Sequence, residues 1–187
     1  MPRAPRLEDQ RTAFLPLLAE AFSAGGYRRT TTAELARRCG VQETILYRLW
    51  PDKRAMFLAA IDYVFLHSQA LYSAVMGETG AGRDRAAALR LLDHQAEHLG
   101  DLRHHRIVFA GLSESDDAEI RRELVRMYKR FHGLVAAKLG GGARNRLASW
   151  GIVALATFTT IARELDLVPA TTRRRILAEL GRRLMGS

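Results

Sequence analysis

Apolar residues recur every three or four positions along most of this chain, which is the spacing of one face of an α-helix. No segment alternates apolar and polar residues as a half-buried strand would. The pattern predicts two short helices between residues 30 and 50, and further helices over 7–24, 52–76, 85–99, 102–112, 113–139, 143–167 and 171–184. We therefore predict an all-α protein of about nine helices, three in a small N-terminal head and six in a bundle.

Glycine and proline positions predict where these helices end. The sequence GETGAGRD at 77–84 is the clearest loop, and the three glycines at 140–142 end a long helix. Pro16 interrupts the first helical pattern, because an internal proline loses a backbone hydrogen bond and clashes with the preceding turn. That helix therefore either begins near Thr12, with Pro16 in its first turn, or is kinked at Pro16.

Residues 26–53 read GYRRTTTAELARRCGVQETILYRLWPDK and predict two short helices joined by a tight turn. The candidate N-caps of the first are Thr30, Thr31 and Thr32. Glu34 follows Thr31 by three residues, as in a capping box. Gly40 stands where the first helix must end, since glycine adopts the left-handed conformation of helix C-caps. Pro51 ends the second helix. This arrangement is a helix-turn-helix.

The second helix of this pair has an apolar side and a polar side. Its inner side is formed by Ile45, Leu46 and Leu49. In a helix-turn-helix the second helix enters the major groove of DNA, and its early residues meet base edges. The exposed side carries residues that can bond to bases or phosphates, namely Gln42, Glu43, Thr44, Tyr47 and Arg48. A recognition helix requires such an apolar side to pack on the protein and such a polar side to contact DNA.

At these residues the chain resembles the TetR family of bacterial transcription regulators. The matching residues are Gly26-Tyr27, Thr30-Thr31, Leu35-Ala36, Gly40-Val41, Leu46-Tyr47, Trp50 and Lys53. The resemblance covers about the first sixty residues. It implies an all-helical fold, a Gly-Val turn, and phosphate contacts from Tyr47 and Lys53. The alternative is a plain antiparallel helix pair inside a bundle.

Four positions depart from the residues that are commonest in that family. Gln42 stands where serine is usual, Thr44 where glycine is usual, Leu49 where histidine is usual and Arg54 where glutamate is usual. Gln42 and Thr44 lie on the predicted reading face. No known operator can therefore be carried over to this chain.

Chemistry and resemblance together suggest roles for the candidate DNA-binding residues, which also include Thr30. We expect the phosphate contacts to come from Thr31, Tyr47 and Lys53. The candidates for base edges are Gln42, Thr44 and Arg48, with Glu43 as an acceptor for a cytosine amino group.

The charge of the chain supports a polyanionic partner. The formal net charge is +9 and the sequence pI is near 10.5. Phosphate contacts usually supply most of the non-specific affinity for DNA. The excess is spread along the chain, with +4 in residues 1–60 and +5 in the remainder. The DNA-binding prediction therefore depends on the helix-turn-helix, with the charge as support.

The sequence predicts a cytoplasmic protein. It has no stretch of eighteen apolar residues, and its first residues, MPRAPR, lack the apolar run of a signal peptide. The single cysteine, Cys39, excludes a disulfide within the chain. We interpret it as a small hydrophobic residue of the helix-turn-helix, with a redox sensor as the alternative.

Catalysis and metal binding find little support in the sequence. His94 and His98 are four residues apart, and His104-His105 follow, so a helical zinc pair is an alternative. No further acid or thiol ligand is marked beside them. No nucleophile–base pair, phosphate loop or cofactor fingerprint is present, so we predict neither an enzyme, nor a cofactor, nor a metal site.

The remainder of the chain is predicted to form a second domain. We place a DNA-binding domain at 1–52 and an effector-binding and dimerisation domain at 53–187. The resemblance implies that the last two helices pair with those of a second copy, and that a small molecule binds between the fourth to eighth helices. Aromatic candidates for such a pocket are Phe65, Phe109, Tyr128, Phe131, Trp150 and Phe158. Each of these is also a candidate for ordinary core.

Overall fold

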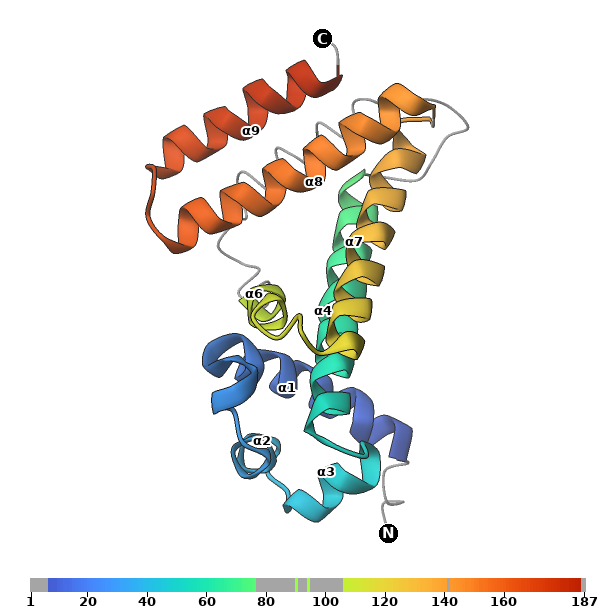
Figure 1. Ribbon diagram of the computed structural model, residues 1–187, viewed down its shortest axis with the longest axis vertical. Helices are drawn as coiled ribbons and strands as arrows, with labels where there is room; N and C mark the ends of the chain where they lie inside the picture. Colours follow the sequence, from blue (N-terminus) through green and yellow to red (C-terminus); the bar gives the residue numbers. More distant parts are fainter. Residues whose placement is uncertain (1–6, 77–89, 91–93, 95–105, 141, 186–187) are drawn as a thin grey trace. The chain divides into compact units, whose positions relative to one another are not determined.

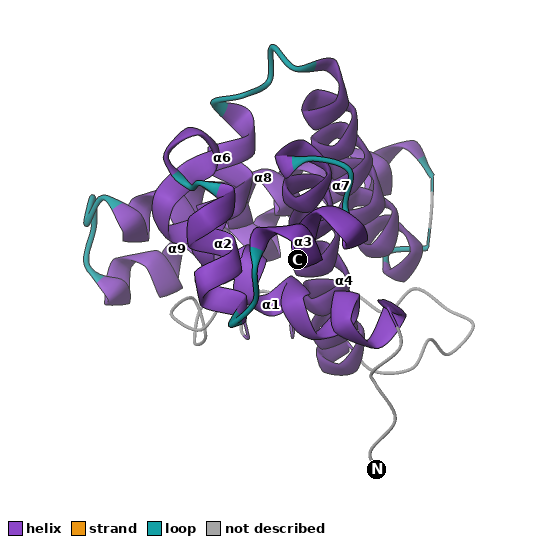
Figure 2. Cartoon of the chain, turned by 90° about the horizontal axis from the view of Figure 1, so that it is seen from below, coloured by secondary structure: helices purple, strands orange, loops and turns teal. Residues whose placement is uncertain are grey.

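The computed structural model describes residues 7–76, 90, 94, 106–140 and 142–185. Within these residues it contains helices and connecting turns but no strand (Figure 2), which confirms the all-α prediction. The eight helices of the described residues, close to the predicted nine, are α1 (Leu7–Arg29), α2 (Thr32–Cys39), α3 (Glu43–Leu49), α4 (Lys53–Met76), α6 (Arg106–Leu112), α7 (Ala118–Lys138), α8 (Ala143–Glu164) and α9 (Ala170–Met185).

The chain divides into two compact units, which are described separately. The first comprises Met1–His67 and Arg103–Met127, and the second comprises Ser68–Leu102 and Tyr128–Ser187. Helices α4 and α7 contribute residues to both (Figure 1). These two units are defined by how the residues pack. The predicted boundary at residue 52 separates a DNA-binding part from an effector-binding part, and it stays a prediction.

The first unit holds α1, α2 and α3 around a buried core. Helix α1 packs on α2 and α6, and α2 packs on α3. Aromatic rings fill the centre, with the rings of Phe22 and Phe57 edge to face at 4.9 Å between centroids. Further fully buried side chains are Leu18, Leu35, Leu46, Trp50, Met56 and Ile61. The short helices α2 and α3 therefore depend on tertiary burial for stability, as helices of this length do.

Helix α1 starts at the predicted residue and extends beyond its predicted end. It begins at Leu7, so Pro16 lies inside the helix and not in its first turn. At its other end the helical angles are interrupted at Gly26, which has φ 74°. Only a residue without a Cβ adopts that angle without strain, so the glycine interrupts the helix two residues after its predicted end at residue 24. Helical turns then resume to Arg29.

Helix α7 begins later than predicted, and its cap is an aspartate. Asp117 Oδ1 accepts from the backbone N–H of Glu119 at 2.8 Å and of Ile120 at 3.2 Å. Ser113, where this helix was predicted to begin, and Ser115 lie in the turns before it. The hydrogen bond from the Ile120 N–H is the main cause that lowers the pKa of Asp117. The Asp117 carboxylate also accepts from Arg54 at 3.3 Å.

We expect Asp117→Ala to lower the melting temperature by about 2–4 °C, because it removes this N-cap. Asp117→Asn should stay closer to wild type, since asparagine also caps helices. Ser115→Ala is the matched control and should change the melting temperature by less than about 1 °C. Thermal unfolding followed by circular dichroism measures all three.

The difference in melting temperature between wild type and Asp117→Ala should depend on pH. A carboxyl whose folded pKa is lowered stabilises the protein above its unfolded pKa of about 3.9, and this contribution is lost as the pH falls through the folded pKa. The difference between wild type and Asp117→Ala should therefore narrow below about pH 4. A difference that stays constant from about pH 6 to pH 3 would contradict a charged cap.

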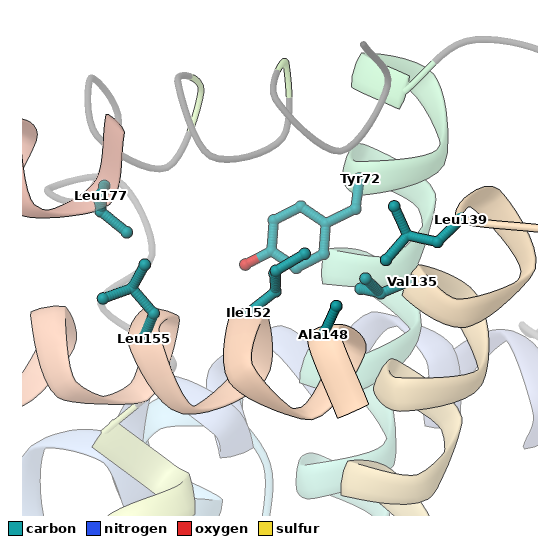
Figure 3. Packing of buried hydrophobic residues seen from close by; sticks show 7 residues of the cluster. All are labelled: Tyr72, Val135, Leu139, Ala148, Ile152, Leu155 and Leu177. Carbon is teal, nitrogen blue, oxygen red and sulfur yellow. The ribbon is translucent and has the colours of Figure 1, made fainter. Parts of the chain in front are cut away.

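The second unit has its own apolar core, drawn in Figure 3. Tyr72 of α4 lies among residues of α7, α8 and α9, and its ring is 5.8 Å from that of Phe131. The buried members are Tyr72, Val135, Leu139, Ala148, Ile152, Leu155 and Leu177. Helices α8 and α9 pack against each other along their length. Burial of these apolar side chains is the main stabilising contribution in this unit.

Other boundaries follow the predictions within a few residues. Helix α8 ends at Glu164, three residues before the predicted end, and Asp166 takes a positive φ of 48° in the following turn. Helix α9 begins at Ala170, directly after Pro169. The predicted loop 77–84 lies outside the described residues, and of the helix predicted at 85–99 only Arg90 and His94 are described, both helical.

Candidate nucleic-acid interface

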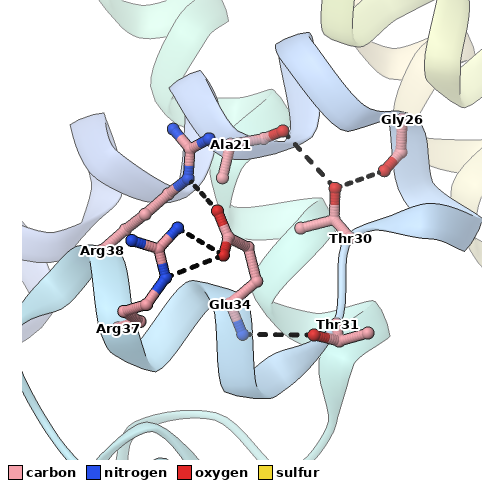
Figure 4. A network of polar contacts seen from close by, with 7 residues as sticks. All are labelled: Ala21, Gly26, Thr30, Thr31, Glu34, Arg37 and Arg38. Carbon is pink, nitrogen blue, oxygen red and sulfur yellow. Dashed lines mark hydrogen bonds and ion pairs between the residues drawn. The ribbon is translucent and has the colours of Figure 1, made fainter.

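The first helix of the predicted pair, α2, begins at a threonine cap (Figure 4). Thr31 Oγ1 accepts from the backbone N–H of Glu34 at 3.2 Å. The Glu34 carboxylate accepts from Arg38 at 2.7 Å and from Arg37 at 2.7 Å, and these hydrogen bonds lower its pKa. The Glu34 carboxylate therefore bonds to the two arginines. It does not make the contact with the backbone N–H of Thr31 that would complete a capping box. The Thr31 hydroxyl proton keeps no partner among the described residues.

The turn between α2 and α3 is closed by glycine, as predicted. Gly40 has φ 68° and ψ 30°, and its N–H donates to the carbonyl of Arg37 at 3.2 Å. The next N–H, of Val41, donates to Ala36 at 3.0 Å. A Cβ built on Gly40 meets no atom within 4 Å, so the glycine is required for its backbone angles and not for space.

Helix α3 presents the polar side that a recognition helix needs. Leu46 is completely buried on its inner side. Gln42 is the N-cap residue, but its side chain makes no capping hydrogen bond. On the outer side, the exposed residues are Gln42, Thr44, Tyr47 and Arg48. The amide, hydroxyl and guanidinium groups that can read base edges are thus directed to solvent.

Thr30 and Glu43, which were predicted to bind DNA, instead join elements within the first unit. Thr30 is only 4% exposed, and its hydroxyl donates to the Gly26 carbonyl at 2.7 Å (Figure 4). Glu43 is half-buried, and its carboxylate accepts from Thr32 Oγ1 at 2.5 Å. Thr30 therefore supports the turn between α1 and α2, and Glu43 links α3 to α2.

Lys53 is held at the start of α4 by Tyr27. Its Nζ donates to the Tyr27 carbonyl at 3.1 Å and lies 4.5 Å from the centre of the Tyr27 ring. The ring packs on Phe22 and Phe57, and burial raises the pKa of the Tyr27 hydroxyl. An ammonium group has three N–H donors, so two remain for an external acceptor. The sequence did not reveal this arrangement, because the two residues are 26 positions apart.

Two other cations of the first unit are paired with carboxylates from the turn before α7 and from the first turn of α7. Arg28 Nε donates to both oxygens of Glu114, at 2.9 and 3.0 Å. Arg54 lies 3.3 Å from Asp117 and 3.0 Å from Glu119. The positive charge available to a phosphate therefore falls on Arg48 and Lys53 more than on these two arginines.

Cys39 does not have the environment of a redox sensor. It is half-buried, and this burial raises its pKa to about 11. Reactive thiols need a lowered pKa, because the thiolate is the reacting species. The interpretation of Cys39 as a small hydrophobic residue is therefore favoured.

The six aromatic pocket candidates belong to two different units of the described chain. Phe65 is buried in α4 and Phe109 lies on α6, both in the first unit. Phe131 packs against the core of the second unit, and Trp150 stacks on His132 with ring centroids 4.4 Å apart. Tyr128 is half-buried on α7 and Phe158 is 45% exposed on α8.

Most of the histidines considered as alternative zinc ligands lie outside the described residues. His94 is described and helical, but His98, His104 and His105 are not among the described residues. The described residues contain no group of three or more histidine, cysteine or carboxylate side chains placed to hold a metal ion. Among these residues, too, no helix combines the length and apolar character that a membrane span requires.

Helices α8 and α9 carry an exposed apolar groove within the second unit. Its lining residues are Gly151, Ala154, Leu155, Phe158, Ile176, Leu180, Arg183 and Leu184. Phe158 and Leu180 are each 45% exposed. A Cβ on Gly151 would stand 3.0 Å from the end of the Leu184 side chain, which would then have to shift. Exposed apolar groups of this kind mark an interaction surface.

Comparison with known proteins gives the same assignment for the head. Residues 18–60 match the model of the family described as bacterial regulatory proteins, tetR family. Nucleoid occlusion factor SlmA from Aliivibrio fischeri strain MJ11 is 41% identical over 61 residues, which are 32% of this chain and 31% of that protein. This chain thus matches about a third of the curated relative's length.

Solved structures extend the likeness along the chain. A transcriptional regulator from Rhodococcus sp. assigned to the TetR family has a TM-score of 0.79 at 18% identity, over 95% of this chain and 99% of that one. A TetR-family regulator from Cytophaga hutchinsonii has a TM-score of 0.77 at 13% identity, over 98% of this chain and 96% of that one. At these identities the likeness concerns the fold. The chain therefore carries the N-terminal domain of the TetR family of bacterial regulatory proteins at residues 18–60, on a fold that TetR-family regulators share.

Proposed function

We propose that this protein is a sequence-specific DNA-binding transcriptional regulator, a homodimeric repressor that a small-molecule effector releases from its operator. The observation that carries the DNA-binding part is the outer side of α3. Gln42, Thr44 and Arg48 are exposed there beyond a turn closed by Gly40. A helix presented in this way fits the major groove and contacts base edges with its early residues.

The proposed phosphate contacts lie on three different elements. Thr31 is the exposed cap of α2, Tyr47 is 47% exposed on α3, and Lys53 is the first residue of α4. Helix starts favour a phosphate, because their backbone N–H groups are unpaired and carry partial positive charge. Gln42, Thr44 and Arg48 would then read bases between these anchors.

The proposed homodimer uses the apolar groove of α8 and α9. Two heads related by a two-fold axis read two half-sites of a pseudo-palindrome. Phe158, Leu180 and Leu184 would be covered by the same residues of a second copy, which removes their apolar surface from water. Dimerisation would thus supply both stability and the symmetry of the operator.

The proposed small-molecule effector rests on the family resemblance alone. The domain boundary at residue 52 and the cytoplasmic location stay predictions from the sequence. The chain has no catalytic constellation in its sequence, so we do not propose an enzyme. The curated relative is a nucleoid occlusion factor, and its match covers 61 residues, which are 32% of this chain.

Selection of bound duplexes from a random DNA pool tests the proposed function. The purified chain should enrich a pseudo-palindrome at low salt. Enrichment of a single half-site would contradict the dimer. Failure to enrich any sequence would favour a helical protein-interaction module over a DNA-binding regulator. Binding that no candidate effector releases would favour a regulator without a ligand.

Lys53→Ala and Gln42→Ala should have different effects on DNA binding. Lys53→Ala should weaken binding to all sequences and reduce the dependence of log affinity on log salt by about one phosphate contact, because it removes a charge. Gln42→Ala should change the preference at one base pair, by about 1–3 kcal/mol, and leave the salt dependence unchanged. Fluorescence anisotropy on matched duplexes measures both. Equal loss on every duplex for Gln42→Ala would contradict its role in base reading.

A further inference from the structure

A chain of three side chains joins the recognition helix to the helix before it. Tyr47 Oη lies 3.2 Å from Thr32 Oγ1, and Thr32 Oγ1 lies 2.5 Å from Glu43 Oε2. Thr32 is the first residue of α2, whereas Glu43 and Tyr47 lie one turn apart on α3. Thr32 and Glu43 are half-buried, and Tyr47 is 47% exposed.

The direction of these hydrogen bonds follows from the chemistry of the groups. An ionised carboxylate only accepts, so the Thr32 hydroxyl must donate to Glu43. The Thr32 oxygen is then the acceptor, and Tyr47 donates its only proton to it. The 2.5 Å contact is in the range of short hydrogen bonds between a hydroxyl and a carboxylate, which are stronger than neutral ones.

We propose that Glu43 is a positioning residue that acts through Thr32 to hold Tyr47 for a DNA phosphate, and that it does not read a base. This inference rests on the proposed function. Thr32 follows the cap residue Thr31, so the Tyr47 hydroxyl is held beside the first turn of α2. When the phosphate arrives, its oxygen replaces Thr32 as the acceptor of the Tyr47 proton. The same link holds α3, with Gln42 and Thr44, at a set angle to α2.

The role predicted from sequence, acceptance from a cytosine amino group, makes different demands on Glu43. A base reader needs its carboxylate in the groove, whereas this carboxylate is half-buried and bound to Thr32. A carboxylate near DNA also repels the phosphates, so deleting it should tighten binding unless it has a structural task. Glu43→Gln removes the charge and keeps an acceptor, and Glu43→Ala removes both.

The first experiment measures affinities for a selected duplex and for duplexes changed at each base pair. Glu43→Ala and Thr32→Val should each weaken binding by about fivefold to tenfold on every duplex, the effect of one lost hydrogen bond. Glu43→Gln should bind as tightly as wild type or more tightly. Loss confined to one base pair, or equal tightening by both Glu43 variants, would overturn the proposal.

A double-mutant cycle tests whether Glu43 acts through Tyr47. Tyr47→Phe removes the hydroxyl and should weaken binding by itself. Adding Glu43→Ala to Tyr47→Phe should then have little further effect on DNA affinity. Fully additive losses would overturn the pathway through Tyr47. Circular dichroism verifies that each variant keeps the helical content and melting behaviour of wild type.

A measurement without DNA separates this proposal from the proposed function. Nuclear magnetic resonance on chain labelled with ¹³C in its tyrosine rings should show the Tyr47 signals shifting in both Glu43→Ala and Thr32→Val, with those of Tyr63 unchanged. If the Tyr47 signals stay in place, the positioning role is wrong whatever the DNA result. If they shift but wild type binds no duplex, the link between the helices is supported and the DNA-binding function fails.

Discussion

Replacing Phe158 by glutamate should dissociate the proposed homodimer and lower operator affinity by more than about 100-fold. Phe158 is 45% exposed and lines the apolar groove of α8 and α9. In a dimer built on this groove the new carboxylate would be buried without a partner, which costs about 3–5 kcal/mol. A monomer also loses the second half-site. Sedimentation equilibrium and anisotropy on the selected operator measure the two effects.

Leu66→Glu is the matched control for this substitution. Leu66 is 48% exposed and lies on the part of α4 that belongs to the first unit. The Leu66→Glu substitution introduces the same charge at a position of similar exposure. It should leave both the dimer and the operator affinity unchanged. A Phe158→Glu variant that remains dimeric would show that the groove is not the dimer interface. Thermal unfolding is recorded in parallel, because a variant that melts far below wild type would have lost its fold and not only its dimer contacts.

Trp50→Ala should lower the free energy of unfolding by about 3–5 kcal/mol, the usual cost of deleting a buried large aromatic side chain. Trp50 is 1% exposed and follows α3 at its C-terminal end. The guanidinium of Arg11 lies 5.4 Å from the centre of its ring. Domains are stable by about 5–15 kcal/mol, so this loss is a large share of the total. Urea unfolding followed by circular dichroism measures it.

Trp50→Phe separates the packing of the indole from its polar atom. The indole N–H is buried without a hydrogen-bond partner among the described residues, so its removal leaves no acceptor unsatisfied there. Phenylalanine fills most of the volume, and we expect a loss below about 2 kcal/mol. Similar losses for the two variants would contradict a role based on filling the core.

The helix ends that sequence predicted correctly depend on short-range interactions. Thr31 bonds to a backbone group three residues ahead, and Gly40 needs only its own angles. Asp52, where the helix over 52–76 was predicted to begin, caps α4 by accepting from the N–H of Ala55 at 2.7 Å. Each contact lies within a few positions of the chain, so residue type and spacing contain the information. The start of α7 was misplaced because Ser113, Ser115 and Asp117 are all plausible caps, and only packing selects among them.

The sites were less accessible to sequence reasoning where two segments meet. Thr30 matched the family pattern, but its hydroxyl is buried against the Gly26 carbonyl. Glu43 stood on the polar side of α3, and its partner is 11 positions earlier. A helical pattern states which side a residue faces, but not which group from another helix is already bound to it. The assignment of the remaining DNA contacts stays a prediction.

By itself the sequence determined an all-helical chain, a helix-turn-helix between residues 26 and 53, and the polar side of its second helix. These features follow from periodicity and caps, which are local properties of the chain. The tertiary structure decided which polar groups remain available to a partner. In the folded chain Lys53 bonds to the Tyr27 carbonyl, and Arg54 pairs with Asp117. Tyr47 bonds to Thr32, which in turn bonds to Glu43. Such pairings depend on how helices distant in sequence pack together, because a hydrogen bond forms only where packing brings donor and acceptor within about 3 Å.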